Sequence, residues 1–325
     1  MESVRGLRKF IRSKTFTLII LVIIIWAFFT IVSGGAFIKL INIRNILNSM
    51  VVTSFLTVGA VFLMICGYID LSTSMIGSMS GVVVAIFLTN LGLPWVLAVL
   101  LALAMSGVIG LFNAFLINGF HFQPFIATMA ISSVVQGLTM VTCGVTAIPI
   151  TEPLMVKIGT ARIADAVPYT IIASLAVISI YGFILSKTNF GKNIYMIGGN
   201  PRAARLSGLN PSRTSYILFL NNALLGGFGG ILLSFRLKAG VVGSVANSQF
   251  AGMTGAILGG VSFGGGSGGM GGAFVGMLLL NGFNNGLTVM GVPPYWQTFA
   301  SGALLLIALS FDYLAMKKTG RTNPF

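Results

Sequence analysis

Few side chains of this chain could carry out acid–base, nucleophilic or metal chemistry. The 325 residues include five acids, two cysteines and one histidine, His121, which stands in a predicted loop. These residues form no carboxylate pair, nucleophile–base set or metal-ligand cluster. We therefore predict that the chain is not an enzyme and that it binds no metal. We interpret Cys66 and Cys143, both in apolar stretches, as small packing residues.

A glycine-rich run, GGVSFGGGSGGMGG at 259–272, could be mistaken for a nucleotide-binding loop. It contains a G-x-G-x-x-G pattern, but no predicted strand precedes it, so dinucleotide binding does not follow. The Gly-Lys-Ser/Thr ending of a phosphate loop occurs nowhere in the sequence. We expect a tight turn here, no cofactor in this chain, and no ATPase activity from the chain itself.

Asp70 is the one acid that falls deep within the apolar part of the sequence, in CGYIDLSTSM. A carboxylate in a membrane is costly unless it is paired or hydrogen-bonded. Gly67 allows a break in the chain, so Asp70 can cap the next helix by accepting from the backbone N–H of Ser72 or Thr73. The alternative is a proton or cation site, which we disfavour because no second membrane acid could relay a proton.

Uncharged amide side chains also interrupt the apolar stretches. Such residues can join helices to one another, or they can line a wet path for a neutral polyol, and both interpretations stay open. Together with Asp70, the residues predicted to line a translocation path or to make polar helix contacts are Asn113, Gln136, Asn221, Asn222, Asn281, Asn284 and Asn285.

The elements that position these residues are predicted to be membrane helices. The sequence is 56% hydrophobic and 7% charged, and apolar runs of bilayer-spanning length recur throughout. We predict an all-α polytopic membrane protein, with residues 1–325 forming one permease-like bundle. The first apolar run, 15–32, is longer than a signal-peptide core, so we expect it to be retained. The predicted helices span 15–33, 47–66, 71–90, 94–117, 123–143, 168–186, 213–234, 247–262, 268–290 and 295–316.

Basic residues indicate the orientation of this bundle. They concentrate in segment 1–14, in loop 187–213 and in the C-terminal tail, which places both termini in the cytoplasm by the positive-inside rule. Arg236 and Lys238 fall on the opposite side and are exceptions. The net charge of +14 is therefore explained by the lipid bilayer, and no basic face typical of a nucleic-acid-binding protein is present.

Glycines spaced four apart indicate close helix packing. The pairs are Gly77 and Gly81, Gly226 and Gly230, Gly255 and Gly259, Gly272 and Gly276, and Gly282 and Gly286. The segments FLINGF (115–120) and LLLNGF (278–283) resemble one another and lie on helices of predicted opposite orientation. Because many transporters contain inverted repeats, we predict one here.

The loop between the sixth and seventh predicted helices contains a short helix with clear boundaries. Asn200 is a good N-cap, Pro201 suits the first helical position, and Gly208 can end the helix in a left-handed conformation. A helix of about two turns is marginal alone, so it must pack against something. The residues of this predicted element are Asn200, Pro201, Arg202, Ala203, Ala204, Arg205, Leu206, Ser207 and Gly208.

Several motifs together resemble those of ribose-type ATP-binding-cassette sugar importer permeases, within the branched-chain amino acid and simple-sugar permease family. They are GYIDLSTSMIGSMSG, FQPFIATMAI, FGKNIYMIGGNPRAARLSGLN and the segment AILGGVSFGGGSGGMGGAFVGMLLLNGFNN, and they follow the family order over nearly the whole chain. The resemblance implies a bacterial cytoplasmic (inner) membrane permease that works as a pair. It also implies cytoplasmic ATPase subunits that bind ATP and Mg, an extracytoplasmic sugar-binding protein, and a coupling role for Asn200–Gly208.

The chain departs from the family pattern at several positions. Family members usually have Glu-Leu-Asp where this chain has Gln249, Phe250 and Ala251, and Arg-Gly where it has Gln136-Gly137. We interpret the first change as a loss of paired charges between permeases, and we expect a second, non-identical permease that keeps them.

The expected function is a permease subunit for a simple sugar, a pentose or related polyol, that works by alternating access. A nucleoside or branched-chain amino acid importer permease is a related alternative. An ion-coupled secondary transporter is an alternative from another class, and a membrane enzyme is a more distant one.

Overall fold

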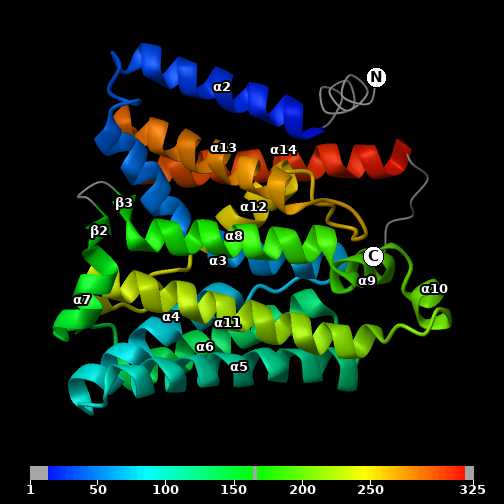
Figure 1. The fold of residues 1–325 in the computed structure, drawn as a ribbon, viewed down its shortest axis with the longest axis horizontal. Helices are drawn as coiled ribbons and strands as arrows, with labels where there is room; N and C mark the ends of the chain where they lie inside the picture. The colour runs from blue at the N-terminus through cyan, green and yellow to red at the C-terminus, as the bar shows by residue number, and fades with distance from the viewer. Residues whose placement is uncertain (1–13, 164–166, 319–325) are drawn as a thin grey trace.

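The computed structural model describes residues 14–163 and 167–318, and these residues form a bundle of roughly parallel and antiparallel helices (Figure 1). The predicted segment 1–14 lies outside the described residues except for its last residue. In chain order the elements are α2 (Lys14–Val32), α3 (Leu40–Cys66), α4 (Thr73–Ala85), the π-helix η1 (Ile86–Asn90), α5 (Trp95–Gly119), α6 (Pro124–Cys143), β1 (Ile148–Pro149), α7 (Pro153–Thr160), β2 (Arg162–Ile163), β3 (Val167–Pro168), α8 (Tyr169–Lys187), α9 (Asn189–Gly199), α10 (Pro201–Leu206), α11 (Pro211–Leu237), β4 (Ala239–Gly240), α12 (Ser248–Leu258), α13 (Met270–Val289) and α14 (Pro294–Lys318).

Helices occupy all ten predicted ranges, but the number of membrane crossings is a separate matter. Seven helices of the described part are long and apolar enough to cross a membrane, which makes the chain a multi-pass membrane protein. α12 has 11 residues. At 1.5 Å per residue it is about 16 Å long, which is too short for a hydrocarbon core of about 30 Å. α3 begins at Leu40, well before the predicted residue 47.

The two ends of the bundle differ in what they carry. Figure 1 shows α9 and α10 at one end, with the start of α2 and the end of α14. We call this the α10 end. The opposite end carries α7, β2, β3 and the start of α3, and we call it the α7 end. The start of α2, the end of α14 and loop 187–213 therefore lie at the same end of the bundle.

Two long helices, α3 and α11, form the centre of the bundle. Each has 27 residues, and every residue of α3 from Met50 to Cys66 is buried. α11 lies against α3, α4 and α5, and α3 also lies against α8, α12 and α13. A helix that is apolar on all faces is expected at the centre of a large bundle, where neighbours cover every face.

α4 and α11 cross without side chains between them, as the glycine spacing predicted. A Cβ atom on Gly77 would lie 2.7 Å from the carbonyl oxygen of Gly226, and one on Gly230 would overlap the carbonyl oxygen of Gly77. Gly81 faces Gly230 in the same way, at 3.0 Å. These distances leave no room for a methyl group, so the two backbones are in direct contact.

The remaining predicted glycine pairs pack in the same manner. A Cβ atom on Gly276 would overlap the carbonyl oxygen of Gly255, and one on Gly272 would overlap that of Gly259. α12 and α13 are therefore joined backbone to backbone. The last pair receives aromatic rings of α2, with Trp26 over Gly282 and Phe29 over Gly286. The glycine spacing thus predicted the contact surfaces correctly.

The α7 end has more structure than the sequence indicated. β1 pairs with β4 and β2 pairs with β3, both antiparallel, and the first pair ties the segment after α6 to the end of α11. α7 packs on the end of α11 through Gly159, whose Cβ position would overlap the backbone at Phe235 and Arg236. β1 and α7 are thus both held at the end of α11.

We predict that Gly230→Ala destabilises the fold by about 1–3 kcal/mol, because the added methyl group must push α4 and α11 apart. The melting temperature of the detergent-solubilised chain measures this effect. Gly137→Ala on α6 is the matched control, since no atom lies within 4 Å of its Cβ position. The control should be neutral or slightly stabilising, because alanine favours helix over glycine. Equal melting temperatures for the two variants would contradict the close crossing.

Candidate functional site

Asp70 lies in the turn between α3 and α4 and is 4% exposed. One carboxylate oxygen, Oδ1, accepts from the backbone N–H of Ser72 at 2.8 Å and from the Ser72 hydroxyl at 2.6 Å. The other oxygen, Oδ2, accepts from the amide of Asn222 on α11 at 2.9 Å. The predicted bond from Asp70 to the Ser72 N–H is therefore present, although Ser72 and not Asp70 immediately precedes α4.

Neighbouring helices complete this group of contacts. Asn113 on α5 donates its amide to the Ser72 hydroxyl at 2.8 Å. Asn222 also donates to the Thr73 hydroxyl at 2.5 Å. From α6, the Thr128 hydroxyl accepts from the backbone N–H of Leu71 at 3.0 Å. Among the predicted site residues, Asp70, Asn113 and Asn222 thus meet at one buried place.

Gln249, the second residue of α12, contacts the same turn. Its Oε1 accepts from the backbone N–H of Ser74 at 2.9 Å, and its Nε2 donates to the carbonyl of Asp70 at 2.9 Å. The Gln249 amide is therefore hydrogen-bonded to both a donor and an acceptor of the α3–α4 turn. We call Asp70, Ser72, Thr73, Asn113, Asn222 and Gln249 the polar knot.

The position of Gln249 corrects the expectation that this residue replaces an acid at an interface between permeases. Its side chain is 5% exposed and is directed into its own chain. Phe250, the next residue, is 56% exposed. The physical reason is that α12 begins inside the bundle, so its first turn faces the α3–α4 turn.

The other predicted polar residues lie apart from the polar knot. Asn221 accepts a hydrogen bond from the hydroxyl of Tyr181 on α8. Gln136 is half-buried on α6, and no hydrogen bond joins its side chain to another described residue.

Three predicted asparagines of α13 form a separate polar stripe with α3 and α14. Asn285 accepts from the amide of Asn42 at 2.7 Å, and Asn281 accepts from the Ser49 hydroxyl at 3.3 Å. Asn284 accepts from the Ser301 hydroxyl at 3.1 Å. We call Asn42, Ser49, Asn281, Asn284 and Asn285 the polar stripe. Ser49 is exposed at its edge, so the stripe borders the surface of this chain.

The short predicted helix is present as α10. The Asn200 side chain accepts from the backbone N–H groups of Arg202 and Ala203, at 3.1 and 3.0 Å, and Gly208 has a left-handed φ of 82°. Ala204 is buried, while Arg202 and Arg205 are exposed.

α10 presents an apolar side chain as well as charges. Leu206 is 91% exposed. α10 is thus held to the bundle by one small residue and leaves its remaining surface uncovered in this chain.

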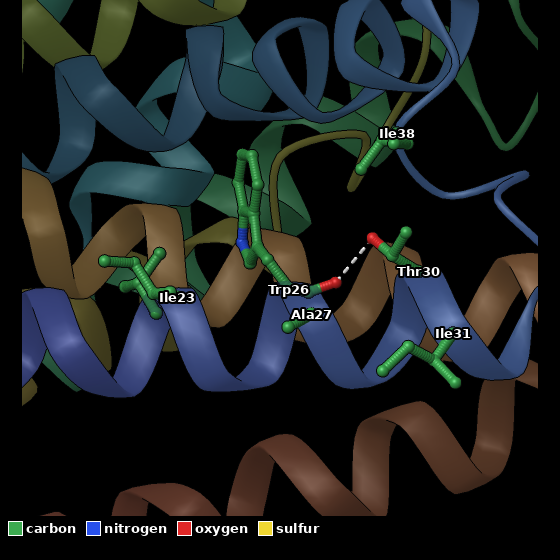
Figure 2. A pocket seen from close by; sticks show the side chains of 7 residues that line it. Ile23, Trp26, Ala27, Thr30, Ile31 and Ile38 are labelled. Atoms are coloured by element: carbon green, nitrogen blue, oxygen red, sulfur yellow. Dashed lines mark hydrogen bonds between the residues drawn. The ribbon is translucent and has the colours of Figure 1, made fainter.

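An apolar groove of about 450 Å³ lies along α2 (Figure 2). Its lining is Val22, Ile23, Trp26, Ala27, Thr30, Ile31 and Ile38, and the Thr30 hydroxyl is bonded back to the Trp26 carbonyl at 2.7 Å. With its one hydroxyl bonded internally, this groove offers no polar group to a polar solute.

The chemistry open to the polar knot is limited. Each carboxylate oxygen of Asp70 accepts from protein donors, and these bonds join the α3–α4 turn to α11. Within residues 14–163 and 167–318, no group of three or more His, Cys, Asp or Glu could hold a metal ion. The geometry therefore supports positioning of helices rather than bond-making chemistry.

Sequence reasoning missed two hydroxyls at this place, Ser72 in the polar knot and Thr128 beside it. Nothing in their spacing indicates that Asn113 donates to Ser72 or that Thr128 accepts from the backbone of Leu71. The departure of Gln249 from the family pattern did mark this position, but the direction in which its side chain points could not be predicted.

The fold and its buried polar contacts define a multi-pass helical membrane protein whose polar residues join helices. Residues 42–309 match the family described as "Branched-chain amino acid transport system / permease component". The chain therefore belongs to this permease family. No solved structure matches the chain.

Several curated relatives are similar over most of their length. The xylose transport system permease protein of Haemophilus influenzae is 27% identical, covering 95% of this chain and 99% of the relative. The L-arabinose ABC transporter permease protein of Azospirillum brasilense is 31% identical, covering 83% and 79%. The galactose/methyl galactoside import permease protein of Escherichia coli is 31% identical, covering 86% and 88%. These relatives are permease subunits of transporters.

We predict that Gln249→Glu lowers the melting temperature more than Gln249→Met. The methionine variant loses two hydrogen bonds, worth about 1 kcal/mol each. The ionised glutamate keeps an acceptor for Ser74 but turns a second acceptor toward the Asp70 carbonyl, close to a buried carboxylate. Two acceptors that face each other repel, and a buried negative charge without its full set of donors costs more than the two lost hydrogen bonds. Thermal unfolding of both variants in detergent measures the order, and a glutamate variant as stable as the unaltered chain would contradict the geometry.

Proposed function

We propose that this chain is the permease subunit of an ATP-driven importer for a simple sugar, with a pentose as the first substrate to test. The observation that carries this proposal is the similarity to xylose, L-arabinose and galactose permeases over at least four fifths of the chain. The whole chain then acts as one transmembrane domain of ten crossings, one of which is made by α12 together with the non-helical segments on either side of it. Its two halves are related as an inverted repeat, and both termini and α10 face the cytoplasm.

In this proposal α10 is the coupling element to a separate ATPase subunit. Arg202 and Arg205, three apart on a helix, share one face, and Leu206 is 91% exposed beside them. An apolar side chain so fully exposed beyond the membrane is readily explained by a partner that covers it. ATP and Mg would be bound by that partner, and closure of the ATPase pair would move the α10 helices together.

The polar stripe is the proposed lining of the sugar path. Side chains such as Ser49 and Asn281 are unfavourable against lipid, but amides and hydroxyls suit the hydroxyl groups of a neutral sugar. A sugar path along the polar stripe is compatible with permeases that work as a pair, because a second permease can complete a path that opens on this surface. Because Gln249 is internal, that second permease need not be a different chain.

An extracytoplasmic sugar-binding protein would deliver the substrate and supply most of the recognition. The ion-coupled alternative requires a membrane carboxylate free to exchange its ion, and Asp70 is occupied by protein donors. Import of a nucleoside or a branched-chain amino acid remains the alternative within the same family.

We predict that sugar uptake into vesicles requires the ATPase subunit and ATP and persists after ionophores collapse the ion gradients. The purified chain alone should hydrolyse no ATP. Radiolabelled pentose uptake, with hexose, nucleoside and branched-chain amino acid for comparison, measures this. Uptake driven by a proton or sodium gradient without ATP would refute the proposal.

We predict that Arg202→Glu with Arg205→Glu releases the ATPase or uncouples hydrolysis from uptake. Two reversed charges add repulsion toward an acidic groove. The measurements are co-purification of the ATPase and sugar uptake. The matched control is Lys187→Glu with Lys192→Glu, which changes the same charge in the same loop outside α10. Should the two double variants behave alike, α10 is no more than a lipid anchor.

A further inference from the structure

The glycine-rich run at 259–272 makes contacts that a tight turn alone does not require. It contains the loop between α12 and α13, where Gly265, Gly266 and Gly268 have positive φ values of 83°, 67° and 123°. Such values favour glycine, because it has no Cβ atom. This loop lies against the end of α3, where the backbone N–H of Gly266 donates to the carbonyl of Ile65 at 2.8 Å.

Gly198, near the end of α9, meets the same two segments. A Cβ atom on Gly198 would overlap the carbonyl oxygen of Ile65 and would lie 2.8 Å from the backbone nitrogen of Gly266. A Cβ atom on Gly265 would lie 2.9 Å from the carbonyl oxygen of Gly198 and 3.3 Å from the backbone of Gly67. Three segments therefore meet through backbone atoms, and we call Ile65, Gly67, Gly198, Gly265 and Gly266 the glycine junction.

A tyrosine of α9 holds the same loop at a second point. The hydroxyl of Tyr195 donates to the carbonyl of Gly268 at 2.7 Å, and Gly268 lies two residues before the start of α13 at Met270. Tyr195 precedes Gly198 by about one helical turn. α9 is therefore attached both to the end of α3 and to the start of α13.

α9 also gives α10 its most direct connection to the bundle. Only Asn200 separates the two helices, and its side chain caps α10. The side chains of Ile194 and Ile197 anchor α9, being 0% and 1% exposed. On its other side, α10 reaches α11 through residues 207–210, which lie outside both helices.

The two helices attached to α9 are those that carry most of the polar stripe. Asn42 and Ser49 lie on α3, and Asn281, Asn284 and Asn285 lie on α13. Contacts between backbones contain no side-chain rotamers that could absorb a small displacement, and close-packed interiors transmit strain. A displacement of α10 would therefore pass through α9 to α3 and α13 together.

We propose that the glycine junction is the mechanical link between α10 and the polar stripe. This inference rests on the proposed function and adds the route by which the motion travels. When the ATPase moves α10, α9 carries the ends of α3 and α13 with it, so the polar stripe shifts as a unit. The chain connection from α10 to α11 is not the main route.

The test uses the assembled transporter in liposomes, with its ATPase and sugar-binding protein, and measures radiolabelled pentose taken up per ATP hydrolysed. Gly198→Ala forces Ile65 and Gly266 away from α9, and Tyr195→Phe removes one hydrogen bond without adding an atom. Both variants should continue to hydrolyse ATP while the ratio falls. Tyr195→Phe should lower it by up to about fivefold, which corresponds to one hydrogen bond, and Gly198→Ala should lower it further.

Matched controls separate coupling from stability. Gly199→Ala adds the same methyl group one residue further on, where no atom lies within 4 Å of the Cβ position. Tyr216→Phe removes a hydroxyl that no hydrogen bond joins to another described residue. Both controls should keep the unaltered ratio. If Gly198→Ala does not co-purify with the ATPase, Tyr195→Phe decides alone. Unaltered ratios in the assembled junction variants would overturn the inference, whatever their melting temperatures.

A reporter in the polar stripe tests the route directly. Ser49→Cys places a thiol at the exposed edge of the stripe, and Cys143→Ser removes the partly exposed native thiol, while Cys66 is buried. ATP should change the rate at which a charged thiol reagent modifies the reporter, and Tyr195→Phe should abolish this change. A rate that ATP changes equally in both backgrounds, or in neither, overturns the inference.

Failure of the proposed function would be seen separately. An unaltered complex that takes up no sugar with ATP would refute the importer before any substitution is made. Loss of the ratio in the junction variants has meaning only against an unaltered complex that transports.

Discussion

The contact between the backbones of α4 and α11 at Gly77 and Gly230 sets the position of the rest of the bundle. Gly226, one turn before Gly230, lies against Thr73, and Asn222, a further turn back, reaches Thr73 and Asp70. A wider crossing would move Asn222 away from the Asp70 carboxylate to which it donates. The close approach of α4 and α11 in lipid is therefore also needed for the hydrogen bonding of a buried charge.

The polar residues of this chain divide according to what surrounds them. In the polar knot, side chains from the α3–α4 turn, α5, α11 and α12 supply hydrogen-bonding groups to one turn, so its carboxylate and neighbouring backbone groups are bonded away from water. In the polar stripe, the amides are bonded to another amide or to serine hydroxyls, and the stripe reaches the surface. A buried group such as the polar knot fixes the positions of helices, whereas a group at the surface such as the polar stripe suits contact with a polar solute.

Much of this arrangement could be predicted from local patterns. The helices followed from apolar runs, the contacts between helices from glycines four apart, and α10 from Asn200, Pro201 and Gly208, because each of these signals acts within a few residues. The polar knot could not be assembled in this way, since Gln249 and Asp70 are far apart in sequence. The direction of Gln249 depends on α12 beginning inside the bundle, and a hydropathy pattern does not distinguish such a helix from a full crossing.

The short helix α12 also bears on how the chain enters the membrane. Val245, in the non-helical stretch before it, packs beside Val52 and Leu56, well inside α3, and its backbone N–H donates to the Ser78 hydroxyl of α4 at 3.1 Å. Backbone outside a helix cannot remain in hydrocarbon unless protein satisfies it. Residues 241–258 are therefore unsuited to independent insertion during synthesis. Their entry must wait for α3 and α4, which makes biogenesis of the C-terminal third depend on prior folding of the N-terminal part.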